Sequence, residues 1–218
     1  FLDHEPSPRA SYYTSQAQQA MGFDMRNFAN RMDTKSYGLW YPQRSLVSTS
    51  YERADGAESR APVGVNPVVA IMSLQGCEED AILVSQGCID RGMFRGTQWD
   101  TKTVTTADRT KRVFASPART PHDDHDPAVG HIDFDTGLAK VGSVLRTGDP
   151  YCALASSTGV RTQKYGGALP AEVERVMVFD NAEGYRTAKL KLRTDRPLMV
   201  GDKLSSRFAQ KGVVSRII

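Results

Sequence analysis

The densest group of potentially reactive side chains lies in the stretch GDKLSSRFAQKG at residues 201–212. Lys203, Arg207 and Lys211 fall within nine residues and are interleaved with small residues. Small neighbours let a polyanion approach both the backbone and the ammonium groups, so this pattern is typical of phosphate recognition. Cations in an ordinary solvated loop would give the same pattern, and the residues alone leave both interpretations open.

A second group is the acidic triplet EED at residues 78–80, which follows an apolar run. Carboxylates at the end of a strand can bind Mg²⁺, which usually keeps several waters and takes one or two protein carboxylates. Glu79 and Asp80 are therefore candidate metal ligands. The alternative is a set of acidic residues at a helix N-terminus, where they stabilise the helix dipole.

Arg9 is the third candidate, because it follows two prolines and lies near the start of a helix predicted over residues 11–22. A helix N-terminus suits an anion such as a phosphate. The alternative is a surface arginine paired with Asp3 or Glu5. The segment HIDFDTG at residues 131–137 also carries acids beside a histidine, but it lacks a third acid in the following positions, and we do not expect it to bind a metal.

Strands make up most of the elements that must position these candidates. The run PVVAIMSL at residues 67–74 is continuous, apolar and β-prone, which predicts a strand covered on both faces that leads toward the acidic triplet. Turn residues in NAEG at 181–184 predict a hairpin of strands at 173–179 and 185–193. The other predicted elements are a strand at 38–50, an exposed loop at 52–59, a short helix at 86–91 with a turn at Gly92, an exposed hairpin at 99–113, and strands at 142–145 and 151–154. The predicted fold class is therefore α+β and mostly β, with a closed or barrel-like sheet in the last two-thirds.

Composition fits an ordinary globular protein of one large domain or two small ones, with 218 residues of which 39% are hydrophobic and 24% charged. The 28 basic and 25 acidic residues give a net charge of only +3, so any contact with a nucleic acid must come from local placement. Three cysteines without a CxxC pair argue against a zinc site or a disulfide framework, and we expect most of them to be buried apolar residues. Because there is no apolar run of about 20 residues and no signal-peptide pattern, we expect an intracellular protein without a membrane span.

The order of three motif groups resembles the second-largest, β-like subunit of multisubunit DNA-directed RNA polymerases over nearly the whole chain. The motifs are DHEPSPR at 3–9 with QAMG at 19–22, then GCEEDA at 76–81 with IDRGMFRG at 89–96, and finally GDKLSSRFAQKG at 201–212. The Ser-Pro-Arg form is more similar to archaeal, eukaryotic and large-DNA-virus enzymes than to bacterial ones. Since the sequence begins at Phe1 and stops just after the third motif, we expect a piece of a longer subunit or a split-gene product.

This resemblance implies one hybrid-binding, active-site region over residues 1–218. It would comprise an N-terminal portion at 1–66 and a β-rich portion at 67–218, which would contain a double-psi β-barrel and an inserted segment near 97–165. The implied activity is template-directed nucleotidyl transfer, in which Lys203 and Lys211 face the RNA 3′ end and the incoming nucleotide. Arg9, with Lys211, would meet the triphosphate of that nucleotide. The residues implied to contact RNA or the RNA–DNA hybrid are Lys203, Arg207 and Gln19.

The resemblance also implies two Mg²⁺ ions, the second of which Asp80 would help to hold, with Glu79 beside it. The sequence has no compact three-aspartate loop for the first ion, so the largest, β′-like subunit is the implied partner. The other implied partners are further polymerase subunits, the DNA template, nascent RNA and nucleoside triphosphates. Two departures from the family pattern are Phe208 and Ala209 in place of His-Gly, and Gln18 in place of a basic residue. A non-catalytic scaffold that binds the hybrid, or a free-standing phosphate-binding module, remains an alternative.

Overall fold

The computed structural model describes residues 30–55, 62, 64–75, 79–106, 114, 130–156, 159–206 and 210–218. The chain divides into two compact units, which are treated separately. The described residues of the first unit lie within Gly38–Gly96 and Pro197–Ile218, and those of the second lie within Ala29–Tyr37 and Thr97–Arg196. The helix predicted over 11–22 lies outside the described residues. Among the residues that are described, no helix is long and apolar enough to cross a membrane.

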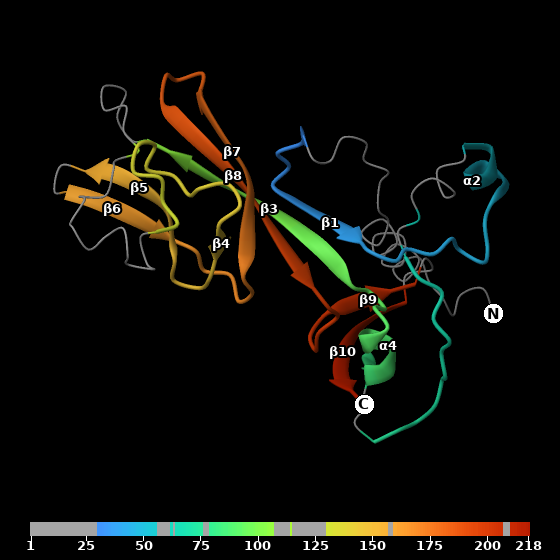
Figure 1. Ribbon diagram of the computed structural model, residues 1–218. Helices are drawn as coiled ribbons and strands as arrows, with labels where there is room; N and C mark the ends of the chain where they lie inside the picture. Colours follow the sequence, from blue (N-terminus) through green and yellow to red (C-terminus); the bar gives the residue numbers. More distant parts are fainter. Residues whose placement is uncertain are drawn as a thin grey trace, which may run out of the picture. The chain divides into compact units, whose positions relative to one another are not determined.

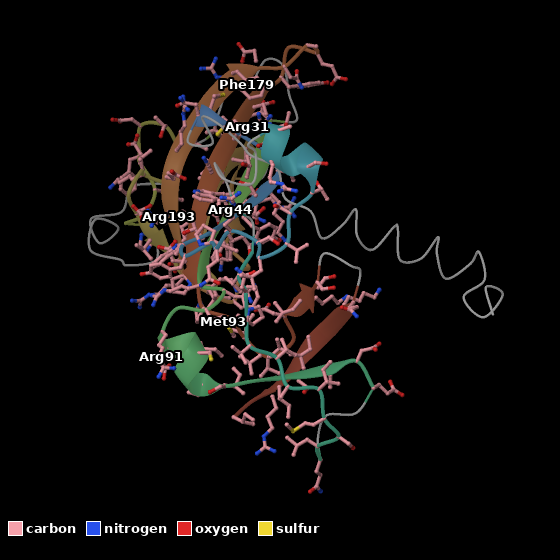
Figure 2. The ribbon with its side chains drawn as sticks, turned by 90° about the vertical axis from the view of Figure 1, so that its right-hand side faces the viewer. Arg31, Arg44, Arg91, Met93, Phe179 and Arg193 are labelled. Atoms are coloured by element: carbon pink, nitrogen blue, oxygen red, sulfur yellow. The ribbon has the colours of Figure 1, made fainter. Side chains whose placement is uncertain are left out.

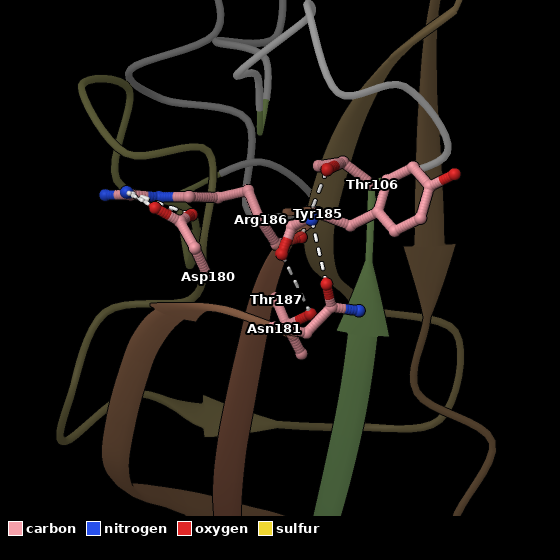
Figure 3. Close-up of polar contacts among 6 residues, drawn as sticks. All are labelled: Thr106, Asp180, Asn181, Tyr185, Arg186 and Thr187. Carbon is pink, nitrogen blue, oxygen red and sulfur yellow. Dashed lines mark hydrogen bonds and ion pairs between the residues drawn. The ribbon is translucent and has the colours of Figure 1, made fainter. Parts of the chain in front are cut away.

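The second unit is built on a five-stranded sheet in the order β1-β3-β8-β7-β4 (Figure 1). The strands are β1 (Lys35–Leu39), β3 (Gly96–Thr105), β4 (Val144–Leu145), β7 (Ala171–Asp180) and β8 (Arg186–Arg196). Strands β7 and β8 form the hairpin predicted from the sequence. The side-chain oxygen of Asn181 accepts a hydrogen bond from the backbone N–H of Tyr185 (2.8 Å; Figure 3). It also accepts one from the backbone N–H of Glu183 (3.0 Å), and the two bonds fix the turn between the strands.

The core of this unit follows the alternation of β8, whose Ala188, Leu190 and Leu192 are buried. They pack with residues of β7 and with Cys152 of β5 (Pro150–Ser156), which pairs with β6 (Gly159–Lys164). Burial raises the pKa of the Cys152 thiol to about 12, so this cysteine is a core residue and not a nucleophile at neutral pH. The short strands predicted at 142–145 and 151–154 are confirmed as β4 and β5.

The first unit contains a three-stranded sheet in the order β2-β10-β9. The central strand β10 (Lys211–Ile217) runs parallel to β2 (Ala81–Val84) and antiparallel to β9 (Lys203–Ser205). A buried cluster of Val84, Leu198 and Val214 covers the inner face of this sheet. The predicted short helix is confirmed as α4 (Gln86–Asp90), and the predicted turn at Gly92 is confirmed by a φ of 93°. The described elements of the chain are thus mostly β.

The prediction of a buried strand at 67–74 is wrong. The segment has no strand assignment, and Figure 1 draws it as an extended trace without an arrow. Val68 and Ile71 are 103% and 99% exposed, and Val69, Met72 and Leu74 are also exposed. An apolar run becomes a buried strand only when neighbouring strands pair with it, and none of the strands in the described residues does so.

Three other predicted elements differ from the structure. The strand expected at 38–50 begins earlier and ends at Leu39, and the hydroxyl of Ser45 donates to the carbonyl of Val47 (2.7 Å) in the loop that follows. The loop expected at 52–59 contains the short helix α2 (Ser50–Asp55). The exposed hairpin expected at 99–113 begins as the long strand β3, whose Val104 is 2% exposed because β3 lies inside the sheet between β1 and β8. Residues 107–113 lie outside the described part of the chain.

Candidate functional site

The register of β9 and β10 brings two of the predicted site residues to one face of the three-stranded sheet. Lys203 lies opposite Val213, and Lys211 lies opposite Ser205. Opposite residues of an antiparallel pair share a face, as do residues two apart along one strand. All four side chains therefore project from the same side, which we call the outer face. Lys203 and Lys211 are diagonal neighbours on it, and residues in this relation are roughly 7–8 Å apart.

Burial along the two strands agrees with this assignment. Lys203, Ser205, Lys211 and Val213 are exposed, whereas Gly212 and Val214 on the opposite side are buried. No salt bridge to either lysine is recorded among the described residues. Two ammonium groups held close together and open to solvent create a local positive potential that attracts anions.

A tight turn fixes the start of β9 and hence the position of Lys203. Gly201 has a φ of 93°, a conformation that favours glycine. The backbone N–H of Asp202 donates to the carbonyl of Met199 (3.1 Å), and the Asp202 carboxylate accepts from the Met199 N–H (2.9 Å). The backbone of Val214 bonds to both Gly201 and Asp202, at 2.8 and 2.9 Å. The Gly-Asp that precedes Lys203 therefore serves to position it.

Gly212 brings Asp80 to the same sheet. A Cβ atom at residue 212 would lie 2.8 Å from the backbone oxygen of Asp80 and 2.7 Å from Cδ1 of Ile82. The absence of a side chain lets β10 lie against the start of β2, where the N–H of Val213 donates to the Asp80 oxygen (3.0 Å). Val213 is thus flanked by Lys203 on one side and by the backbone of Asp80 on the other. The structure therefore brings Asp80, Lys203 and Lys211, which are far apart in sequence, to one small sheet.

Glu79 directly precedes Asp80 and adopts a left-handed conformation with a φ of 52°. Both residues are exposed. In the part of the chain that the structure describes, no group of three or more histidine, cysteine, aspartate or glutamate side chains could hold a metal ion. Glu79 and Asp80 could therefore supply only some of the ligands of a metal.

The other predicted site residues, Arg9, Gln19 and Arg207, lie outside the described residues. The two residues that flank 207–209 are described. The hydroxyl of Ser206 donates to the side-chain oxygen of Gln210 (3.1 Å) and accepts from its backbone N–H (3.3 Å). This pair joins the ends of β9 and β10 on the side of Lys211.

The IDRGMF segment is a structural support of this sheet. Ile89, Met93 and Phe94 pack against the buried cluster on its inner face. Gly92 combines its positive φ with a close approach to Tyr41, whose ring would lie 2.8 Å from an added Cβ. The guanidinium of Arg91 donates to the carbonyl of Gly87 (3.3 Å). Arg91 and Met93, which follow the C-terminal end of α4, are labelled in Figure 2.

The acids at 131–137 hold their own turn together. The carboxylate of Asp133 accepts hydrogen bonds from the Asp135 N–H (3.2 Å) and the Thr136 hydroxyl (2.9 Å). His131 lies 3.4 Å from the carboxylate of Asp149. These contacts explain why acids and a histidine occur together here.

Comparison with known proteins agrees with the resemblance in the motifs. A family model described as RNA polymerase Rpb2, domain 6, matches residues 1–218. The chain is 33% identical to DNA-directed RNA polymerase II subunit RPB2 of Schizosaccharomyces pombe, over 98% of this chain and 19% of that protein. It is 31% identical to DNA-directed RNA polymerase I subunit RPA2 of Homo sapiens, over 100% of this chain and 20% of that protein.

A viral relative is similar to the same degree. DNA-directed RNA polymerase subunit 2 of Acanthamoeba polyphaga mimivirus is 31% identical over 98% of this chain and 19% of that protein. The chain thus spans about a fifth of the length of the relatives it matches. Because the family model covers every residue, the chain belongs to the family of second-largest RNA polymerase subunits, in the region described as Rpb2 domain 6.

Proposed function

We propose that this chain forms part of a DNA-directed RNA polymerase and that its outer face contacts phosphates during nucleotide addition. The observation that supports this is the register of β9 and β10, which holds Lys203 and Lys211 as exposed neighbours on one face. The relatives carry the names of polymerase subunits but are about five times longer. We therefore expect the chain to be inactive alone and active only within an assembled enzyme.

The proposed reaction is the attack of an RNA 3′-hydroxyl on the α-phosphate of a nucleoside triphosphate, directed by a DNA template, with release of pyrophosphate. Negative charge develops on the phosphate oxygens in the transition state, and preorganised cations lower its energy. Lys211, together with Arg9, would contact the triphosphate. Lys203 would contact the RNA 3′ end, with Arg207 and Gln19 on RNA or the hybrid.

Asp80 and Glu79 would contribute ligands to the second of two Mg²⁺ ions. Their chemistry fits, because both are exposed carboxylates and Mg²⁺ typically binds one or two protein carboxylates together with substrate phosphates. When bound, two such ions stabilise the attacking and leaving oxygens of the displacement. We propose that the largest, β′-like subunit holds the first ion.

The proposed partners follow from the same reaction. They are the largest subunit and other polymerase subunits, the DNA template, nascent RNA and nucleoside triphosphates, all inside a cell or a virion. We also propose that the three-stranded sheet is one part of a double-psi β-barrel in the hybrid-binding region. The placement of β10 between a parallel and an antiparallel neighbour supports this, since a mixed sheet of this kind needs connections that cross over.

The test is the Lys211→Ala substitution in the assembled polymerase. We expect nucleotide addition, measured by rapid quench at saturating nucleotide, to slow by about 10²-fold or more, as for the loss of one preorganised electrostatic contact. Folding and assembly should be nearly unchanged, because Lys211 is exposed and forms no salt bridge with another described residue.

The matched control is Lys164→Ala, which removes an exposed lysine from β6 in the second unit. Its nucleotide-addition rate should equal that of the unmodified enzyme. If the Lys211→Ala enzyme adds nucleotides at the normal rate but loses its complexes faster at high salt, the outer face binds the hybrid without contributing to the chemical step. That result would favour the scaffold alternative.

A further inference from the structure

Arg216 is a cation that none of the three motifs includes, and the structure places it on the same outer face as Lys203 and Lys211. The pairing of β10 with β2 contains an irregularity, because Val214 lies opposite Ile82 but Arg216 lies opposite the next residue, Leu83. Ser215 is therefore an extra residue on β10, which is the arrangement of a β-bulge.

The bulge decides which way Arg216 points. Regular alternation would place residue 216 on the same side as Gly212 and Val214, in the buried cluster. The shift instead pairs Arg216 with Leu83 and Ile217 with Val84, so Ile217 packs in the cluster and Arg216 is exposed. The hydroxyl of Ser215 donates to the carbonyl of Ile82 (3.3 Å), which anchors the bulge to β2.

The strand residues of the outer face therefore carry one sign of charge, with Glu79 and Asp80 just before the start of β2. The residues of the three strands that do not face the cluster are Ala81, Leu83, Lys203, Ser205, Lys211, Val213, Ser215 and Arg216. Three of these described residues are cationic and none is acidic. Val213 is 38% exposed and Leu83 is partly exposed, so a small apolar surface, which we call the apolar floor of the outer face, lies between the lysines and Arg216.

The spacing of the cations fits a chain of phosphates. Val213 lies two residues beyond Lys211 on β10. On β2, Leu83 lies opposite Arg216 and two residues beyond Ala81, which lies opposite Val213. These four residue steps place Lys211 and Arg216 about 13 Å apart along the sheet. One strand of a duplex carries a phosphate for each 3.4 Å of its helix axis, so a face of this length spans more than one phosphate of the strand. A run of phosphodiesters, with its sugars over the apolar floor, matches this face better than a single phosphate group does.

We propose that Arg216 binds a backbone phosphate of a nucleic-acid strand that crosses the outer face, as an extension of the site formed by Lys203 and Lys211. The strand is either the nascent RNA or the DNA template, which share this chemistry. The inference rests on the proposed function, but Arg216 differs from Lys211 in its role: it holds the strand and takes no part in the chemical step.

The experiment compares the Arg216→Gln substitution with the unmodified sequence in the assembled polymerase on a synthetic RNA–DNA scaffold. Dissociation of the complex is measured from low to high salt. We expect about tenfold weaker binding, as for the loss of one hydrogen bond to a charged group, and a salt slope smaller by about one. The rate of a single nucleotide addition should stay within about twofold of normal.

Neutral methylphosphonate linkages, placed one at a time in the RNA or in the template strand, identify the source. At the contacted linkage, Arg216→Gln should no longer weaken binding, because the charge it would meet is already gone. If neutral linkages in the RNA abolish the effect of Arg216→Gln on binding, Arg216 contacts the transcript. If neutral linkages in the template abolish it, Arg216 contacts the DNA. If neutral linkages in neither strand abolish it, the proposal is overturned.

Two further variants separate this idea from others. Arg216→Lys keeps the charge and should retain most of the binding, so equal losses for Lys and Gln would overturn a phosphate contact. Arg161→Gln removes an exposed arginine from β6 in the second unit and should leave the salt slope unchanged. A slope for Arg216→Gln equal to that of Arg161→Gln also overturns the proposal. Failure of the Lys211→Ala test would instead overturn the proposed function, whatever the result at Arg216.

Discussion

At the scale of single residues, Gly212 is the position on which the candidate site depends most. Its lack of a side chain lets β10 lie so close to β2 that a Cβ atom added at residue 212 would be only 2.7–2.8 Å from atoms of Asp80 and Ile82. One of the colliding atoms is a backbone oxygen, which cannot move aside as a flexible side chain can. We expect Gly212→Ala to destabilise the first unit by about 1–3 kcal/mol, the usual cost of overpacking. Urea denaturation followed by limited proteolysis of the first unit measures this.

Gly166→Ala is the matched control for that substitution, since an added Cβ there would meet no heavy atom within 4 Å. This variant should unfold at the same urea concentration as the unmodified chain. Equal stability of the two alanine variants would contradict the close approach of β10 to β2.

At the scale of elements, the turn before β9 determines where Lys203 lies. The Asp202 carboxylate that accepts from the Met199 N–H is the side-chain contact that closes this turn. We expect Asp202→Ala to cost about 1 kcal/mol of stability, as for the loss of a side-chain cap, and to slow nucleotide addition by the assembled enzyme. Asp202→Asn keeps an acceptor oxygen and should recover much of the stability. A variant with normal stability and a normal rate would show that the turn does not position Lys203.

Local signals explain which elements could be predicted from the sequence. The β7–β8 hairpin and the turn at Gly92 were predictable because Asn181, Gly184 and Gly92 specify turns with their own backbone and side-chain chemistry. The conformation of the segment at 67–74 was not predictable in this way. An apolar composition favours burial, but it does not show whether a neighbouring strand is present to pair with the segment. The bulge at Ser215 was equally invisible, because it arises from the register between β10 and β2.

At the scale of the whole molecule, the segment at 67–74 is a run of exposed apolar side chains within the described part of the chain. Contiguous apolar side chains in water promote association. We expect the 218-residue chain to self-associate, and the double substitution of Val68 and Ile71 by Lys to reduce this without a loss of stability. Analytical ultracentrifugation over a range of concentrations measures the association. The control is Val141→Lys, at an exposed position of the second unit, which should leave the association unchanged. A cooperative loss of structure in the double variant would show that the segment is packed.

The division of the chain also constrains the order in which its sheets form. The second unit interrupts the first, so β2 is synthesised long before β10, and the paired residues Ala81 and Val213 lie about 130 residues apart. All of Thr97–Arg196 lies within that interval, so these residues of the second unit are synthesised before β10. Once folded, the second unit shortens the effective loop between β2 and β10 and lowers the entropy lost when they pair. The outer face is therefore completed only after Thr97–Arg196 of the second unit have been synthesised.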